Sequence, residues 1–209
     1  MGTVLTDLTN YRLLVAIRYL NASEELWRGL KEEQGTNDFH FLVTLRSFIE
    51  YTRRGIWFLA WATEKRLERA EHLTFKDAGS PPLKDMDALL NEALGLGRVC
   101  PLMNIVPGVN EPYLHCLHAL THGNPISVRM VGMGLLNVFD TANLLLRAEV
   151  DLNIFKILVY RRAAGQELAP IWKMLSTIHD NPDDLRANVM IAAHQLKEKG
   201  LNFPIATSA

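Results

Sequence analysis

The chain has 209 residues, of which 22 are basic and 23 are acidic, so its formal net charge is −1. This length suits one domain, and the balanced charge excludes attraction of a polyanion by bulk charge, so that nucleic-acid binding would need a local basic patch. Its two cysteines, Cys100 and Cys116, are too few for a disulfide framework, and the amino terminus lacks a signal-peptide pattern. We therefore expect a cytoplasmic protein.

Two apolar stretches, 39–62 and 126–146, approach the length of a membrane-spanning helix. Each of them contains charged residues, among them Arg46 in the first and Asp140 in the second. Membrane-spanning helices rarely tolerate such charges. We therefore expect no membrane segment and interpret both stretches as core helices.

The first half of the chain predicts two long helices. Thr6-Asp7 is a capping site, and apolar residues with helical spacing follow it as far as Leu30. A turn at 35–38 ends in a second capping site, and the next helix is predicted from Phe39 to about His72, with its first half buried.

The second half of the chain predicts shorter helices separated by glycine and proline. Gly132 and Gly134 fall inside one of them, where they would allow a neighbouring helix to approach closely. No stretch alternates for long with the period of a β-strand. The predicted helices are 83–94, 113–122, 126–149, 151–162, 168–179 and 183–199, with irregular structure at 95–108.

These elements predict an all-α fold, a helical bundle built on two long central antiparallel helices with additional shorter helices. The central pair is expected to be the second helix and the 126–149 helix. We expect one domain, 1–209, in which residues 151–209 form either part of the bundle or a C-terminal helical appendage.

A histidine stripe is the most distinctive feature of the sequence. His115, His118 and His122 are spaced i, i+3 and i+7 within 113–122, so a helix would present them on one face. Asn110 is the expected cap of this helix, and Gly123 its stop. The candidate binding residues around the stripe are Tyr113, His118, Asn124, Ser127 and Arg129.

Three interpretations of the stripe stand beside one another. Imidazole titrates near neutral pH, which suits acid/base or phosphate chemistry, and His122 lies where the helix ends and solvent enters. The imidazoles could instead be structural groups at a helix interface. A metal site using His115, His118 and Glu111 is the third interpretation, but ligands from one helix hold a metal poorly. We expect no metal and no cofactor.

Arg46 and Glu50 form a second candidate pair, four residues apart in an apolar helical stretch. A buried ion pair of this kind either fixes the packing of the helix or has a functional reason. If Arg46 points at the histidine helix, its planar guanidinium is suited to binding phosphate.

The two segments LRSFIEYTRRGIWFLAW and YLHCLHALTHGNPIS together resemble uncharacterised bacterial families of the HEPN superfamily. Those families show an Arg-Ser-x-x-Glu helix, then a tyrosine and a helix that ends in His-Gly or His-Pro-Ser. The resemblance runs from the second helix to the start of the 126–149 helix. The matching positions are Arg46, Ser47, Glu50, Tyr113, His122, Gly123 and Ser127.

This resemblance implies an α-helical bundle, often a homodimer, in a superfamily rich in metal-independent ribonucleases of toxin–antitoxin, abortive-infection and CRISPR-linked systems. In the catalytic members an arginine and a histidine a few residues apart meet across a dimer cleft and cleave RNA through its 2′-hydroxyl. This chain departs from the pattern, because Leu117, Cys116 and His115 stand where that arginine is expected. Either His115 replaces it, or Arg46 approaches His122 from the other helix.

The leading hypothesis is a HEPN-like, metal-independent endoribonuclease of a bacterial defence or toxin system. In it His122 is the general acid/base, Arg46 stabilises phosphate charge, and Glu50 and His115 orient these two groups. The first alternative is a non-catalytic module that binds RNA, a nucleotide or a protein partner and whose Arg/Glu/His network is structural. The second alternative is a helical metal-binding protein.

Overall fold

The computed structural model describes residues 2–67, 79–98, 100–134, 136, 139–178 and 182–198. Within these ranges the chain is helical apart from turns, connecting segments and one sheet of two short strands. The predicted all-α helical bundle is confirmed.

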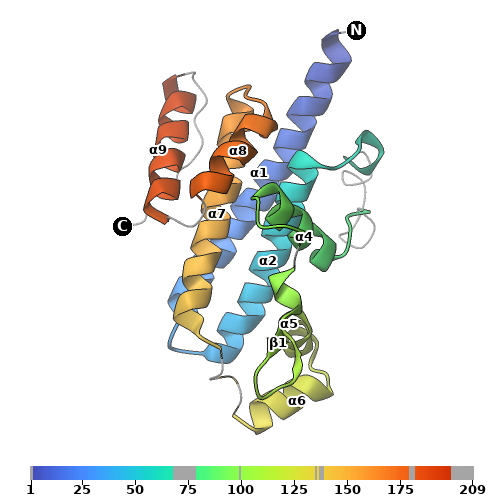
Figure 1. Ribbon diagram of the computed structural model, residues 1–209, viewed down its shortest axis with the longest axis vertical. Helices are drawn as coiled ribbons and strands as arrows, with labels where there is room; N and C mark the ends of the chain where they lie inside the picture. Colours follow the sequence, from blue (N-terminus) through green and yellow to red (C-terminus); the bar gives the residue numbers. More distant parts are fainter. Residues whose placement is uncertain are drawn as a thin grey trace.

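Three long helices form the centre of the bundle: α1 (Gly2–Glu33), α2 (Asp38–Ala60) and α7 (Thr141–Ala163). They lie side by side along the longest axis of the molecule, with α1 antiparallel to both α2 and α7 (Figure 1). Large apolar side chains such as Phe58 and Phe155 are fully buried between them. The predicted central pair of the second helix and the 126–149 helix is therefore wrong: the two long antiparallel helices are α1 and α2, and α7 is a third central helix.

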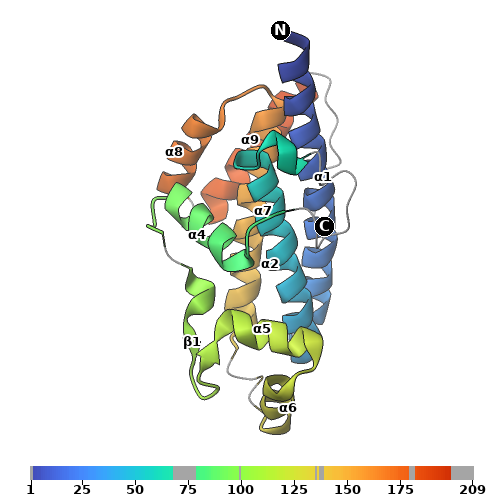
Figure 2. The same cartoon turned by 90° about the vertical axis from the view of Figure 1, so that its right-hand side faces the viewer.

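The shorter helices cover this centre on two sides. Helices α8 (Leu168–Ile178) and α9 (Pro182–Glu198) pack against α7, and α4 (Leu83–Ala93) packs against α2. The remaining elements gather at one end of the bundle, where α5 crosses α2 (Figure 2). They are η1 (Pro101–Met103), β1 (Ile105–Val106), β2 (Glu111–Pro112), α5 (Tyr113–His122) and α6 (Pro125–Gly132).

A short hairpin leads directly into α5. Strands β1 and β2 are antiparallel, with Ile105 opposite Pro112. Asn110 lies in the turn between them at φ 62°, a left-handed conformation that asparagine tolerates. The prediction that Asn110 caps α5 is therefore wrong, because Pro112 occupies the cap position. The Tyr113 N–H donates to the Asn104 carbonyl at 2.9 Å, which fixes the start of α5.

The predicted helix 126–149 is wrong, because the chain forms α6, turns, and begins α7 only at Thr141. The α7 helix then continues through the predicted 151–162 helix, so residues 152–160 are buried in the central bundle. A Cβ added at Gly132 or Gly134 would meet nothing within 4 Å, so neither glycine serves close packing. Close approach occurs instead at Gly55, where an added Cβ would lie 2.7 Å from Cβ of Tyr19.

The ends of the first two helices also differ from the predictions. Helix α1 begins at Gly2, before the expected cap at Thr6-Asp7. Asn37 caps α2 as predicted, its side chain accepting the His40 N–H at 3.1 Å. However, α2 ends at Ala60 and not near His72, and a separate helical turn follows at 64–67. The rest of the predicted extension, 68–78, lies outside the described residues.

None of the helices within the described ranges combines the length and the apolar character that crossing a membrane requires. The predicted absence of a spanning helix therefore holds for that part of the chain.

Candidate functional site

A row of polar side chains follows one side of α2. Arg46 Nη1 donates to Glu50 Oε2 at 2.6 Å, and Arg54 Nη2 donates to Glu50 Oε1 at 2.7 Å. Arg54 Nη1 also donates to Ser80 Oγ at 2.5 Å. The i, i+4 pairing of Arg46 with Glu50 is therefore formed, and a second arginine joins it one turn later.

Glu50 is held in its charged form by its two arginines. Burial alone would raise the pKa of its carboxyl group, but Arg46 and Arg54 together lower the pKa below its usual value. The carboxylate in turn restricts Arg46, whose side chain is only 14% exposed. Among the described residues, the buried Nε of Arg46 has no hydrogen-bond acceptor.

The histidine stripe lies on α5 as its spacing predicts. His115, His118 and His122 are all exposed, whereas Cys116 and Leu117 of the same helix are buried. The rings of His118 and His122 are neighbours, with centroids 4.3 Å apart. The stripe is therefore an accessible surface and not part of the core.

Charged residues of the polar row on α2 act on a histidine of the stripe on α5. The pKa of His118 is lowered by partial burial first, then by the positive charges of His122 and Arg46. Glu50 acts on the same imidazole in the opposite direction. We call Arg46, Glu50, His118 and His122 the Arg–His surface.

Two further predicted residues, Asn124 and Ser127, have local structural partners. The Asn124 side chain caps α6 by accepting the N–H groups of Ile126 and Ser127 at 3.0 and 3.3 Å. Ser127 is buried, and its hydroxyl donates to the Asn124 carbonyl at 2.6 Å. Arg129 lies exposed on α6. The first two side chains therefore fix the turn that follows His122.

His115 lies on the stripe beside a carboxylate of the preceding strand. Its Nδ1 is 3.6 Å from Glu111 Oε2, and both side chains are exposed to solvent. In the part of the chain that the structure describes, no three His, Cys, Asp or Glu side chains are arranged to hold a metal ion. The geometry therefore does not favour the metal site built on His115, His118 and Glu111.

Tyr113 is separated from the stripe and lies in a cavity of about 620 Å³ between α2, α4 and α7. Its ring packs against Phe139 with centroids 5.4 Å apart. Burial raises the pKa of its hydroxyl well above the usual value, although Arg147 acts in the opposite direction. Helix α5 thus has its first residue in the cavity and its last histidine on the Arg–His surface.

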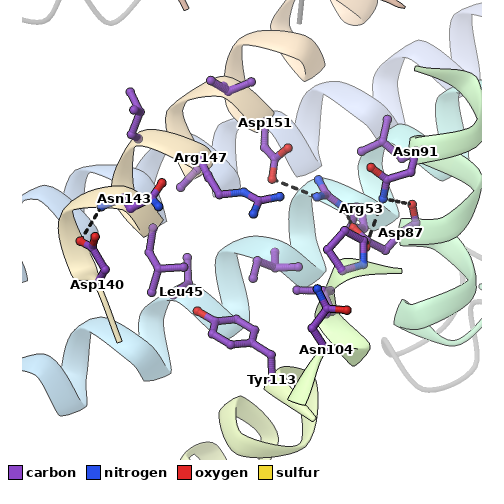
Figure 3. A pocket seen from close by; sticks show the side chains of 18 of the residues that line it. Leu45, Arg53, Asp87, Asn91, Asn104, Tyr113, Asp140, Asn143, Arg147 and Asp151 are labelled. Atoms are coloured by element: carbon purple, nitrogen blue, oxygen red, sulfur yellow. Dashed lines mark hydrogen bonds and ion pairs between the residues drawn. The ribbon is translucent and has the colours of Figure 1, made fainter. Parts of the chain in front are cut away.

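Arg53 is the main charged group of this cavity, and the sequence interpretation missed its role. Its Nε donates to Asp87 at 2.7 Å and its Nη2 donates to Asp151 at 2.9 Å (Figure 3). These carboxylates raise the pKa of the guanidinium despite complete burial. One signal of a buried arginine was available in the sequence, since Arg53 lies in an apolar stretch seven residues after Arg46. The two carboxylates that bind Arg53, however, lie 34 and 98 residues away along the chain.

Comparison with protein-family models, with curated proteins and with solved structures finds no match to this chain.

Proposed function

We propose that this protein binds RNA at the Arg–His surface and cleaves it by metal-independent acid/base chemistry. The observation that carries the proposal is a pair of exposed, neighbouring imidazoles on α5, with ring centroids 4.3 Å apart, beside the ion-paired Arg46 of α2, whose charge lowers the pKa of His118. An open surface of this kind suits a phosphate within a polymer better than an enclosed pocket does. The resemblance to the HEPN superfamily adds a homodimer to the proposal.

The reaction needs a base, an acid and a positive charge. The 2′-hydroxyl oxygen attacks the adjacent phosphorus after the base takes its proton, and the acid gives a proton to the departing 5′ oxygen. The products are a 2′,3′-cyclic phosphate and a 5′-hydroxyl. His118, whose lowered pKa favours the neutral form, is suited to be the base. We assign the role of the acid to His122, whose ring is its neighbour.

The remaining residues position these groups. The guanidinium of Arg46 stabilises negative charge on the phosphorus-bound oxygens in the transition state. Glu50 holds Arg46 through their 2.6 Å ion pair. His115 lies on the same face of α5 as His118 and helps to lower the pKa of His118. We assign His115 this supporting role.

The proposal is tested with end-labelled single-stranded RNA in buffer containing EDTA. We expect cleavage by the native protein, and about 100-fold or more loss of rate in His122→Ala, as for removal of a general acid. His194→Ala is the matched control, since His194 is an exposed histidine on α9, which packs against α7 and α8. RNA with a 2′-deoxy sugar at the cut position should resist cleavage.

Absence of cleavage, or equal cleavage by His122→Ala, would exclude a nuclease that works through this surface. The alternative of a structural network in a non-catalytic binding module predicts that His122→Ala lowers the melting temperature by several degrees. Because His122 is exposed, we expect no such change. Melting curves recorded on the same samples separate the two cases.

A further inference from the structure

The cavity between α2, α4 and α7 has the dimensions of a small-molecule site. Its volume of about 620 Å³ lies within the range of roughly 300–1,000 Å³ that such sites occupy. It adjoins the face of α2 that carries Leu45, Ile49 and Arg53. Leu45 and Ile49 directly precede Arg46 and Glu50 in the sequence, so the two faces are rotated by about 100° about the helix axis. The cavity is therefore a separate site from the Arg–His surface.

Two buried hydrogen-bond donors in the cavity call for an acceptor. Within the described structure, the buried Nη1 of Arg53 and the buried hydroxyl of Tyr113 have no hydrogen-bond partner. Arg147 extends from α7 into the same space (Figure 3). A buried donor without an acceptor costs about 1–3 kcal/mol, so an oxygen-bearing occupant would stabilise this arrangement.

Water is a poor occupant of the apolar part of this space. A buried water needs two to four polar partners. Donors are available near Arg53, Tyr113 and Arg147, but much of the wall is apolar and offers none. The apolar side chains of the wall include Leu45, Ile49, Leu90, Leu94, Leu144 and Ile154.

The charges of the lining favour an uncharged oxygen over a carboxylate. Arg53 and Arg147 contribute two positive charges, while Asp87, Asp140 and Asp151 contribute three negative charges. Arg53 already forms ion pairs with Asp87 and Asp151. A third carboxylate at Arg53 would lie beside two like charges, whereas a carbonyl or hydroxyl oxygen would accept the same hydrogen bond without repulsion.

We propose that this cavity binds an uncharged, largely apolar small molecule whose carbonyl or hydroxyl oxygen accepts hydrogen bonds from Arg53 Nη1 and from Tyr113 or Arg147. The apolar part of the molecule occupies the space between α2, α4 and α7. The proposal does not depend on RNA cleavage at the Arg–His surface.

Four probes with the same apolar body test the proposal on the full chain: 4-phenylbutan-2-one, 4-phenylbutanoate, 4-phenylbutylammonium and butylbenzene. Binding is measured by changes in the amide NMR signals of Tyr113 and Arg53 as each probe is added. We expect the ketone to bind most tightly and the two charged probes at least about tenfold more weakly, a difference of ~1.4 kcal/mol.

Two variants locate the binding site without removing Arg53. Tyr113→Phe keeps the ring and removes the hydroxyl, so affinity for the ketone should fall about three- to tenfold while butylbenzene is unaffected. Leu96→Trp enlarges a lining residue that is 48% exposed, and should weaken both probes. Tyr51→Phe, outside the lining, is the matched control and should change neither affinity.

Three results would overturn the proposal. The first is no signal change with any probe at about 1 mM, which would mean that the cavity holds water only. The second is tighter binding of the carboxylate than of the ketone, which would make the site an anion site. The third is unchanged ketone affinity in both Tyr113→Phe and Leu96→Trp, which would place the ketone elsewhere.

Discussion

Arg53 connects three parts of the chain through a single buried guanidinium, ion-paired with Asp87 and Asp151. Replacing it in Arg53→Met leaves two carboxylates without their cation, and we expect the free energy of unfolding to fall by about 3–5 kcal/mol. Arg28→Met is the control, because Arg28 is 49% exposed and pairs with the exposed Glu25, a pair worth less than about 1 kcal/mol. Urea unfolding curves of both variants measure the difference, and equal losses would contradict this account.

His118 should titrate below the ordinary range for histidine. Partial burial and the charges of His122 and Arg46 lower its pKa. We expect the ring NMR signals of His118 to move at lower pH than those of histidine in an unstructured peptide, and Arg46→Gln to raise the pKa of His118 by removing a positive charge. Because the pKa of His118 is lower in the folded than in the unfolded protein, folding favours the neutral imidazole. The contribution of His118 to stability is therefore present above its unfolded pKa and is lost as the pH falls through that value toward the folded pKa. Identical His118 titrations in both proteins would exclude this coupling.

Part of the candidate site could be predicted from residue spacing alone. The ion pair of Arg46 with Glu50 and the shared face of His115, His118 and His122 are local features of a helix, and the structure confirms both. The partners of Arg53 could not be predicted in this way, because they depend on how distant helices pack. A spacing rule carries no information about such contacts.

Gly55 determines how closely α2 approaches its two neighbours. A Cβ at this position would lie 2.6 Å from a ring carbon of Phe155 and 2.7 Å from Cβ of Tyr19. We expect Gly55→Ala to lower the free energy of unfolding by about 1–3 kcal/mol through overpacking. Gly29→Ala on α1 meets only Thr44 at 3.8 Å, so its better helix propensity should leave stability unchanged or raise it by up to ~1 kcal/mol. Thermal unfolding that fails to separate the two variants would contradict the prediction.

Helix boundaries were predicted well where a local stop signal dominates and poorly elsewhere. Gly123 ends α5 in a left-handed conformation, φ 62°, as predicted. The break between α6 and α7 had weaker signals: Gly134 at φ 65°, and Asp140, whose side chain accepts the Asn143 N–H at 3.0 Å. The apolar residues between them masked these signals. The end of α2 had no glycine or proline, and Trp61 there stacks on Trp172 of α8, a contact between distant segments.

Buried tyrosines, Tyr19 and Tyr160 among them, make the whole bundle sensitive to alkali. Burial raises the pKa of both Tyr19 and Tyr160 to about 12, with Glu24 adding to the effect at Tyr160. Their contribution to stability is complete below the unfolded pKa of about 10, and it is lost as pH rises toward 12. We expect the urea midpoint to fall over this range by an amount equivalent to a few kcal/mol in total.

The tyrosine contribution is isolated by comparing the native protein with Tyr160→Phe. The variant should lose less stability between pH 9 and pH 11.5, because one ionisable group is missing from its unfolded state. Absorbance at 295 nm on the same samples reports ionisation of the remaining tyrosines. Parallel stability curves for the two proteins would show that Tyr160 has no part in alkaline unfolding.

Helix α5 has ten residues and is therefore about 15 Å long. Its first side chain lines the cavity and its last histidine is exposed to solvent. A helix this short moves as one rigid body, so a tilt that begins at Tyr113 displaces His122 as well. Any occupant that repositions the tyrosine would therefore change the distance between the imidazoles and Arg46, and an anion bound at Arg46 would act on the cavity in return.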